Sequence, residues 1–476
     1  RMIAHNGEIN ALRGNINWLR AREGLLKTEV FGDDIKNIYP IVVPGGSDSA
    51  TLDNVLELIV LSGRPLYQAL MMLVPGAWEQ NRQMGEKLRD FYKYQACLME
   101  PWDGPAALAV TDGTRIGALL DRNGLRPARV IVTKNDFVVM ASEVGVLDID
   151  PKDIAFSTRL EPGKIFFIDT EEGRIIQDSE IKESVSSAKP YGSWLQENML
   201  ELDAIAETGV VAQGSSDVLV SLKAFGYTRE DLKVIMKPMA EAGQEPVGSM
   251  GSDTPHAVLS RQPQVLYSYF KQLFAQVTNP AIDPIREELV MSLESYIGPQ
   301  RNLLEETKDH CRKVHVKRPI LTNEELEKIR ALKINGFKTK TISILCKAGS
   351  TQEFNKTLER ICAEAQNAIK EGFTFIILSD RGVDREHAAI PALLAVGAVH
   401  HHLVRNALRA QIGIILESGE PREVHHFTVL FGYGVDCVNP YLAYEALAYM
   451  VQEKLLALDV KTAVKNYIKA VDKGIM

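Results

Sequence analysis

A regular alternation of apolar and amphipathic segments after residue 338 constrains the fold more than any other feature of the sequence. Four short apolar segments have the length of buried strands; they are residues 341–346, 373–380, 412–418 and 435–440. Longer segments with the apolar spacing of helices follow them in turn; they are residues 353–372, 390–408, 422–434 and 441–455. Successive strand–helix units predict an α/β fold with a parallel sheet, which we expect to be barrel-like.

Polar residues follow two of these strands, at the end where such folds usually keep their active sites. They are Ser379-Asp380-Arg381-Gly382 and Glu417-Ser418-Gly419. A phosphate or flavin site would need paired glycines at the start of a helix, and neither segment offers them. We therefore expect both segments to be structural.

The first half of the chain has a different pattern, which predicts an α+β fold. Residues 10–24 and most of residues 52–96 have helical spacing, whereas short alternating segments separated by Asp-Gly, Asn-Gly and Asn-Asp turns begin at Ala106. Such segments are typical of antiparallel strands. A polar stretch between about residues 178 and 200, with Pro190 and Gly192, predicts a domain boundary. We place the two domains at residues 1–197 and 198–476.

Two short motifs near the N-terminus are candidates for a functional site. In residues 4–10 (AHNGEIN) an apolar strand runs into Asn6-Gly7, a turn-tolerant pair whose N–H groups could stabilise an anion. In residues 45–51 (GGSDSAT) Asp48 comes just before a helical pattern, where free N–H groups would hold its carboxylate. Each motif alone is also compatible with a simple hairpin turn or a helix cap.

Composition excludes several classes of function. The 476 residues are 45% apolar and 24% charged, as in ordinary globular proteins of two to four domains. The net charge is −8 and there is no basic block, so a nucleic-acid partner is not expected. The longest apolar stretch, residues 388–399, is too short to cross a membrane, and no segment is typical of a signal peptide. We expect a cytoplasmic protein without a membrane partner.

Neither cysteines nor histidines form a metal-binding pattern. The five cysteines lack the close spacing of iron–sulfur ligands and lie at positions 97, 311, 346, 362 and 437. His400, His401 and His402 are consecutive, and helical neighbours point about 100° apart, so the three cannot bind one metal. His425 and His426 could add ligands only from another helix. We expect no metal site.

Several long motifs, in a fixed order, resemble the glutamate synthase family, and the likeness covers essentially the whole chain. They are residues 1–15, 45–58, 98–113, 116–130, 140–149, 237–255, 277–287 and 378–384. The resemblance implies that residues 1–197 belong to a class II glutamine amidotransferase domain with the αββα sandwich of N-terminal-nucleophile hydrolases. It implies that residues 198–476 are the central domain of the large subunit, which is similar to a flavin domain but binds no cofactor.

The resemblance also implies roles for individual residues. The side chain of Asn6 and the N–H of Gly7 match the catalytic oxyanion hole, and Asp48 matches the carboxylate that, with Gly7, binds the glutamine substrate. Thr278, Asn279 and Ile282 match sequence along an ammonia tunnel. The family's catalytic cysteine would precede Arg1, so we expect the chain by itself not to hydrolyse glutamine.

In the family, ammonia released from glutamine is used for the reductive synthesis of L-glutamate from 2-oxoglutarate, an oxidoreductase reaction of glutamate biosynthesis and ammonia assimilation. The resemblance implies FMN and an iron–sulfur cluster in the part of the parent protein after Met476, and none in this stretch. It implies as partners the FMN-binding domain of the same polypeptide and either a small subunit or ferredoxin as electron donor. A plastid location would follow if a targeting segment preceded this stretch.

Two alternatives remain open at this point. The chain could be a catalytically inert scaffold, or a different class II amidotransferase such as the phosphoribosyl-pyrophosphate type. The second alternative requires a phosphoribosyltransferase loop, which the sequence does not show. NADPH, NADH and ferredoxin all remain possible electron donors.

Overall fold

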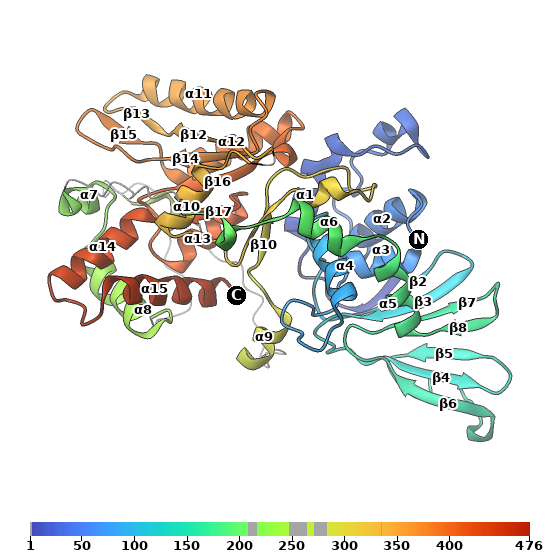
Figure 1. Cartoon of the computed structure of the whole chain (residues 1–476). Coiled ribbons are helices and arrows are strands. Elements are labelled where there is room, and N and C mark those ends of the chain that lie inside the picture. The colour runs from blue at the N-terminus through green and yellow to red at the C-terminus, as the bar shows by residue number, and fades with distance from the viewer. Residues whose placement is uncertain (1, 208–216, 247–263, 271–282, 335) are drawn as a thin grey trace. The chain divides into compact units, whose positions relative to one another are not determined.

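The computed structural model describes residues 2–207, 217–246, 264–270, 283–334 and 336–476 (Figure 1). The chain divides into two compact units. The N-terminal unit consists of Arg1–Met199, Thr278–Ser292 and Gln300–Cys311. The C-terminal unit consists of Leu200–Val277, Leu293–Pro299 and Arg312–Met476. The structure therefore assigns to the N-terminal unit two short segments that the sequence placed after residue 197.

Antiparallel strands build two sheets in the N-terminal unit (Figure 1). The five-stranded sheet has the order β1-β2-β3-β7-β8, with β1 Ile3–Gly7, β2 Ala106–Thr111, β3 Arg115–Leu120, β7 Ile165–Asp169 and β8 Arg174–Ile176. The three-stranded sheet has the order β5-β4-β6, with β4 Arg129–Thr133, β5 Val138–Ala141 and β6 Ile154–Arg159. The antiparallel strands predicted after Ala106 are thereby confirmed.

Helices of the N-terminal unit account for the remaining core. They are α1 Arg13–Arg22, α2 Asp48–Leu61, α3 Leu66–Leu73, α4 Glu86–Ala96, α5 Asp178–Ser187, α6 Tyr191–Asn198 and α9 Pro284–Val290. The polar stretch after residue 178 is not a linker, because it forms α5 and α6. Their few apolar residues, including Ile181, Val185 and Leu195, are buried at helical spacing, which a reading based on average polarity missed.

The C-terminal unit is organised around a parallel sheet of order β12-β14-β16-β17. These strands are β12 Thr339–Ser343, β14 Phe375–Ser379, β16 Gly413–Glu417 and β17 Cys437–Asn439. Alternate residues enter two separate cores: Ile376 and Leu378 pack on one face, and Phe375 and Ile377 on the other. Burial on both faces explains why these strands are continuous apolar runs.

Further helices and strands complete the C-terminal unit. The helices are α7 Val218–Ala224, α8 Lys237–Ala242, α10 Asn323–Arg330, α11 Thr351–Lys370, α12 Ala392–Arg405, α13 Val424–Gly432, α14 Tyr441–Gln452 and α15 Val460–Ile475. The remaining strands are β9 Leu200–Glu201, β10 Ser295–Ile297, β11 Val314–Val316, β13 Leu345–Lys347 and β15 His387–Ala389. The predicted parallel α/β arrangement is confirmed, and closure of the sheet into a barrel stays a prediction.

At the carboxyl end of the parallel sheet, the polar strand-end residues bind one another. Glu417 accepts hydrogen bonds from Ser379 Oγ at 2.7 Å, Arg381 Nε at 2.6 Å and Arg330 Nη2 at 2.8 Å. Asp380 is fully buried and accepts from Ser418 Oγ at 2.6 Å. The side chains at this edge therefore form an internal network.

Two carboxyl groups near this edge have strongly raised pKa values. Burial raises the pKa of Asp380 to about 7, although Ser418 and other donors oppose the shift. Burial likewise raises the pKa of Glu420 to about 7, against a hydrogen bond from the N–H of Ala392. Both groups therefore hold their proton far above the pH at which an unfolded chain would release it.

The raised pKa values predict a loss of stability with rising pH. Stability contributed by Asp380 is fully present below the unfolded pKa near 4 and is lost as the pH rises through about 7. Between these values the free energy of unfolding should fall by about 1.4 kcal/mol per pH unit for one such group. Urea unfolding at pH 5 to 8 should show that the free energy of unfolding of Asp380→Asn falls less steeply with pH than that of the wild type. The exposed Asp384→Asn is the control, and equal slopes in both variants would contradict the prediction.

Candidate functional site

The end of β1 presents the backbone N–H of Gly7 at the edge of its sheet. Glu8 N donates to Pro105 O at 3.2 Å, and Asp121 N donates to Ala106 O at 3.2 Å, so Ala106 turns its polar groups toward β3. Gly7 lies opposite Ala106 and is therefore in a non-hydrogen-bonded pair of the β1–β2 ladder. Because β1 is an edge strand of its sheet, the N–H of Gly7 points to the open edge.

The alternative that Asn6-Gly7 is a simple hairpin turn is wrong. Both residues lie in β1, where Asn6 pairs with Ala107 and Gly7 with Ala106. Gly7 has a φ of +136°, and the O atom of Pro105 lies only 1.9 Å from where a Cβ on Gly7 would stand. Glycine is thus required by close strand approach as well as by backbone conformation. Asn6 is exposed, whereas its neighbours His5 and Gly7 are half-buried.

Two carboxylates of α2 bind the open edge of β1. Asp53 Oδ1 accepts from the N–H groups of Met2 at 2.7 Å and Ile3 at 2.9 Å. Asp48 Oδ2 accepts from the N–H of Ile9 at 3.2 Å. Ile3 and Ile9 lie on either side of Gly7, each an even number of residues away from it. In an extended chain their N–H groups therefore point to the same side as that of Gly7. The two carboxylates therefore fix the strand edge at both ends and leave the Gly7 N–H between them.

Asp48 is held as an anion at the start of α2. Ser47 caps this helix by accepting from Ala50 N at 3.2 Å, and Asp48 Oδ1 accepts from Ser49 N at 2.6 Å. Burial alone would raise the pKa of Asp48. The N–H groups of Ile9 and Ser49, together with the nearby His5, hold the pKa below its usual range.

His5 links the two candidate motifs directly. Its Nε2 lies 3.4 Å from Asp48 Oδ2, and its side chain is 8% exposed. Its Nδ1 is buried and has no hydrogen-bond partner in the part of the chain that the structure describes. Sequence reasoning named neither His5 nor Asp53. The position of His5 directly before Asn6 gave a signal, whereas Asp53 stands in an apolar helix without any motif.

The loop opposite Gly7 is fixed by its own polar contacts. Asp103 O accepts from Asn10 N at 2.8 Å, and Asp103 Oδ2 binds Arg122 Nη2 at 2.8 Å. Asp121 is buried and accepts from the N–H groups of Ala106 at 3.2 Å and Asn123 at 2.7 Å. The residues around Asp103 and Asp121 were predicted only as parts of long motifs. In the structure they position the backbone that pairs with β1.

The remaining candidate residues fall into two groups: those outside the described residues, and histidines with partners elsewhere. Thr278, Asn279 and Ile282 lie outside the described residues. Among the residues that the structure describes, no group of three His, Cys, Asp or Glu side chains could hold a metal ion. His402 Nε2 instead contacts Gln366 Oε1 at 2.8 Å, and His426 Nε2 contacts Glu423 Oε1 at 2.8 Å. No helix in these ranges is long and apolar enough to span a membrane.

Two family models match the chain in succession. The model of class-II glutamine amidotransferases matches residues 1–194. The model of the glutamate synthase central domain matches residues 220–476.

Curated relatives match along the whole chain. The large chain of NADPH glutamate synthase from Bacillus subtilis is 45% identical over 476 residues, which are 100% of this chain and 31% of that protein. The NADH glutamate synthase of Schizosaccharomyces pombe is 45% identical; the match covers 100% of this chain and 23% of that protein. The chloroplastic ferredoxin-dependent glutamate synthase of Oryza sativa subsp. japonica is 41% identical; the match covers 100% of this chain and 30% of that protein. The chain thus spans less than a third of these relatives.

One solved structure also matches, that of glutamine phosphoribosylpyrophosphate amidotransferase from B. subtilis. The match covers 95% of this chain and 72% of the amidotransferase chain. It is 12% identical with a TM-score of 0.19, a likeness too weak to carry an argument.

The contact between Gly7 and Pro105 predicts a specific stability difference. Gly7→Ala should lower the free energy of unfolding by about 2–4 kcal/mol, since an unfavourable φ adds to overpacking against a backbone oxygen. Gly14→Ala is a suitable control because Gly14 lies in α1 with nothing within 4 Å of the added Cβ; it should stabilise by about 0.5–1 kcal/mol. Chemical unfolding followed by circular dichroism measures both. Equal stabilities of the two variants would refute the close approach.

Proposed function

Because the chain belongs to the family defined by the glutamate synthase central domain, we propose that it is part of a glutamate synthase. The class II amidotransferase part would release ammonia from glutamine for the reductive synthesis of L-glutamate from 2-oxoglutarate. The observation that carries this proposal is the succession of both family models along one chain. An inert scaffold or a phosphoribosyl-pyrophosphate amidotransferase would leave the match over residues 220–476 unexplained.

In the proposed reaction, Asn6 and Gly7 stabilise the oxyanion formed when the glutamine amide is attacked. The N–H of Gly7 points to the open edge of β1, and the Asn6 side chain next to it is exposed. Donors fixed before the reaction begins need no reorganisation as negative charge develops. The bonds from Asp48 and Asp53 to neighbouring N–H groups supply this rigidity.

Asp48 is proposed to bind the α-ammonium group of glutamine. Its side chain is 21% exposed and, with a lowered pKa, remains a carboxylate at neutral pH. A carboxylate has about four acceptor positions; the N–H groups of Ile9 and Ser49 and the Nε2 of His5 occupy three of them. The remaining position can accept an ammonium donor without breaking the contact to the strand.

The remaining parts of the proposal concern the longer polypeptide. FMN and an iron–sulfur cluster would be bound outside residues 1–476, and the FMN-binding domain of the same polypeptide would receive the ammonia. FMN when bound supplies the hydride chemistry of the reduction. We further infer a cytoplasmic or plastid enzyme, an αββα arrangement for residues 1–197 and a barrel-like central domain over residues 198–476. A small subunit or ferredoxin would supply electrons.

Substitutions of Asn6 and Asp48 in the full-length enzyme should have different kinetic effects. Asn6→Ala should lower glutaminase kcat by about 10²- to 10³-fold, the usual loss for one oxyanion donor. Asp48→Asn keeps an acceptor for the Ile9 N–H but removes the charge, so it should mainly raise the KM for glutamine. Asn10→Ala, a nearby exposed position, is the control. Identical effects of the first two variants on kcat and KM would refute the assigned roles.

The proposed tunnel at Thr278, Asn279 and Ile282 has its own test. Ile282→Trp in the full-length enzyme should leave glutamine hydrolysis largely intact while reducing glutamine-dependent glutamate formation. Synthesis from added ammonia should be less affected, because external ammonia need not pass the constriction. The ratio of glutamine consumed to glutamate formed is the measurement. A ratio equal to that of the wild type would remove this segment from the tunnel.

A further inference from the structure

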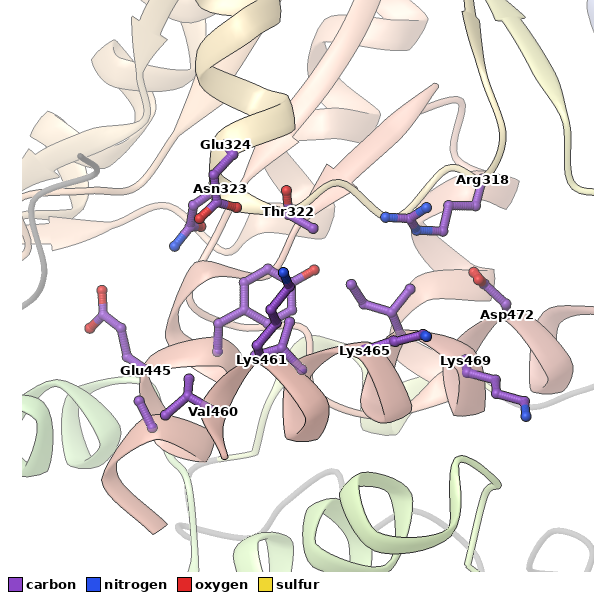
Figure 2. Close-up of a pocket in the computed structure, with 14 residues that line it drawn as sticks. Arg318, Thr322, Asn323, Glu324, Glu445, Val460, Lys461, Lys465, Lys469 and Asp472 are labelled. Atoms are coloured by element: carbon purple, nitrogen blue, oxygen red, sulfur yellow. The ribbon is translucent and has the colours of Figure 1, made fainter. Parts of the chain in front are cut away.

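The C-terminal unit contains a large open groove with two unlike walls (Figure 2). Its volume is about 1070 Å³. Figure 2 shows Arg318, Thr322, Asn323 and Glu324 along one wall, and α15 along the other. Tyr444 and Ala448 of α14 also line it. We call it the α15 groove.

One stripe of α15 offers the groove an apolar surface. Val460, Val464 and Ile468 line it at four-residue spacing, which places them on one face of the helix. Ile468 is only 5% exposed and belongs to the core, Val464 is half-buried against that core, and Val460 is 40% exposed. Val460 and Val464 are therefore the members of the stripe that a partner could contact. An apolar helix face normally packs against another element. The α15 groove therefore has the surface of a helix-packing site.

A second stripe beside it is cationic. Lys461, Lys465 and Lys469 line the groove, also at four-residue spacing, and all three are exposed. None of them has an ion pair within the described ranges. Of the acidic residues lining the groove, Glu445 already binds Arg381 at 3.4 Å. The open charge along α15 thus favours an acidic partner.

The end of the groove near Arg318 and Asp472 contains unsatisfied polar atoms. Arg318 Nε and Asp472 Oδ1 are both buried and have no hydrogen-bond partner among the described residues. The two side chains lie on opposite walls at the same end of the groove in Figure 2. Burial also raises the pKa of Asp472 to about 6.

We propose that an acidic amphipathic helix, from the part of the same polypeptide outside residues 1–476, lies in the α15 groove. Its apolar face packs on Val460 and Val464, and acidic side chains four residues apart face Lys461, Lys465 and Lys469. That the helix belongs to the same polypeptide rests on the proposed function. The B. subtilis relative is much longer than the matched stretch, which is only 31% of its length, so a glutamate synthase has further segments that could supply the helix. A tethered segment also binds at a high effective concentration. Helix α15 runs to Ile475, at the end of this stretch.

Lysine acetylation of the native full-length protein with acetic anhydride tests this occupant. We expect Lys461, Lys465 and Lys469 to react about tenfold more slowly than the exposed Lys223 and Lys347, after normalising each site to the denatured protein. Mass spectrometry reads each site separately. Equal rates would overturn the proposal. Protection that falls on dilution would identify a second copy as the occupant, and protection that needs an added protein would identify a separate partner; both outcomes overturn the commitment to the same polypeptide.

A charge-reversal pair adds a second measurement. Lys465→Glu in the full-length protein should weaken the docked helix and make Lys461 and Lys469 reactive, whereas Lys347→Glu should not. Lys465→Arg should retain protection because it keeps the positive charge. Unchanged protection in Lys465→Glu would show that charge complementarity does not hold the segment. Glutaminase activity, measured in parallel, tests the proposed function separately, because no groove residue belongs to the glutamine site.

Discussion

The candidate site depends on the hydrogen bonds that two carboxylates of α2 accept from backbone N–H groups at the edge of β1. An edge strand has a row of unpaired N–H groups, and such a strand would normally be mobile or would pair with another chain. Asp53 binds the N–H groups of Met2 and Ile3, and Asp48 binds that of Ile9. The strand is thereby fixed without adding another strand, which would have covered the N–H of Gly7.

This arrangement explains why two motifs 40 residues apart belong to one site. Asp48 is the first residue of α2, so free helical N–H groups and the Ile9 N–H stabilise its charge from two directions. The same carboxylate has one oxygen near His5, which directly precedes Asn6. A change in the position of α2 would therefore alter both the position of the Asp48 charge and the strand edge that carries the Gly7 N–H.

The sequence predicted the elements better than their contacts. The strands around Ile376 and Ile414 could be identified because burial on both faces makes them continuous apolar runs. The role of Asn6-Gly7 as strand rather than turn could not, because an antiparallel partner 100 residues away decides it. Asp53 gave no signal either: a carboxylate that accepts two backbone N–H groups has the same one-letter code as a solvated one. Helices α5 and α6 were missed because few apolar residues suffice to bury one face.

At the carboxyl edge of the parallel sheet, the polar side chains bind one another. In such folds the strand ends leave polar groups that a ligand can use. Here Glu417 is enclosed by Ser379, Arg381 and Arg330, and Asp380 by Ser418 and Gly419. These buried groups satisfy one another, and a ligand would have to replace several charge-assisted bonds to enter. The Gly7 N–H, by contrast, points to the open edge of β1, and the buried Arg318 Nε and Asp472 Oδ1 beside the α15 groove have no partner among the described residues. Because buried polar groups in folded proteins are nearly always paired, a binding partner gains most free energy where the protein itself has left donors and acceptors unused.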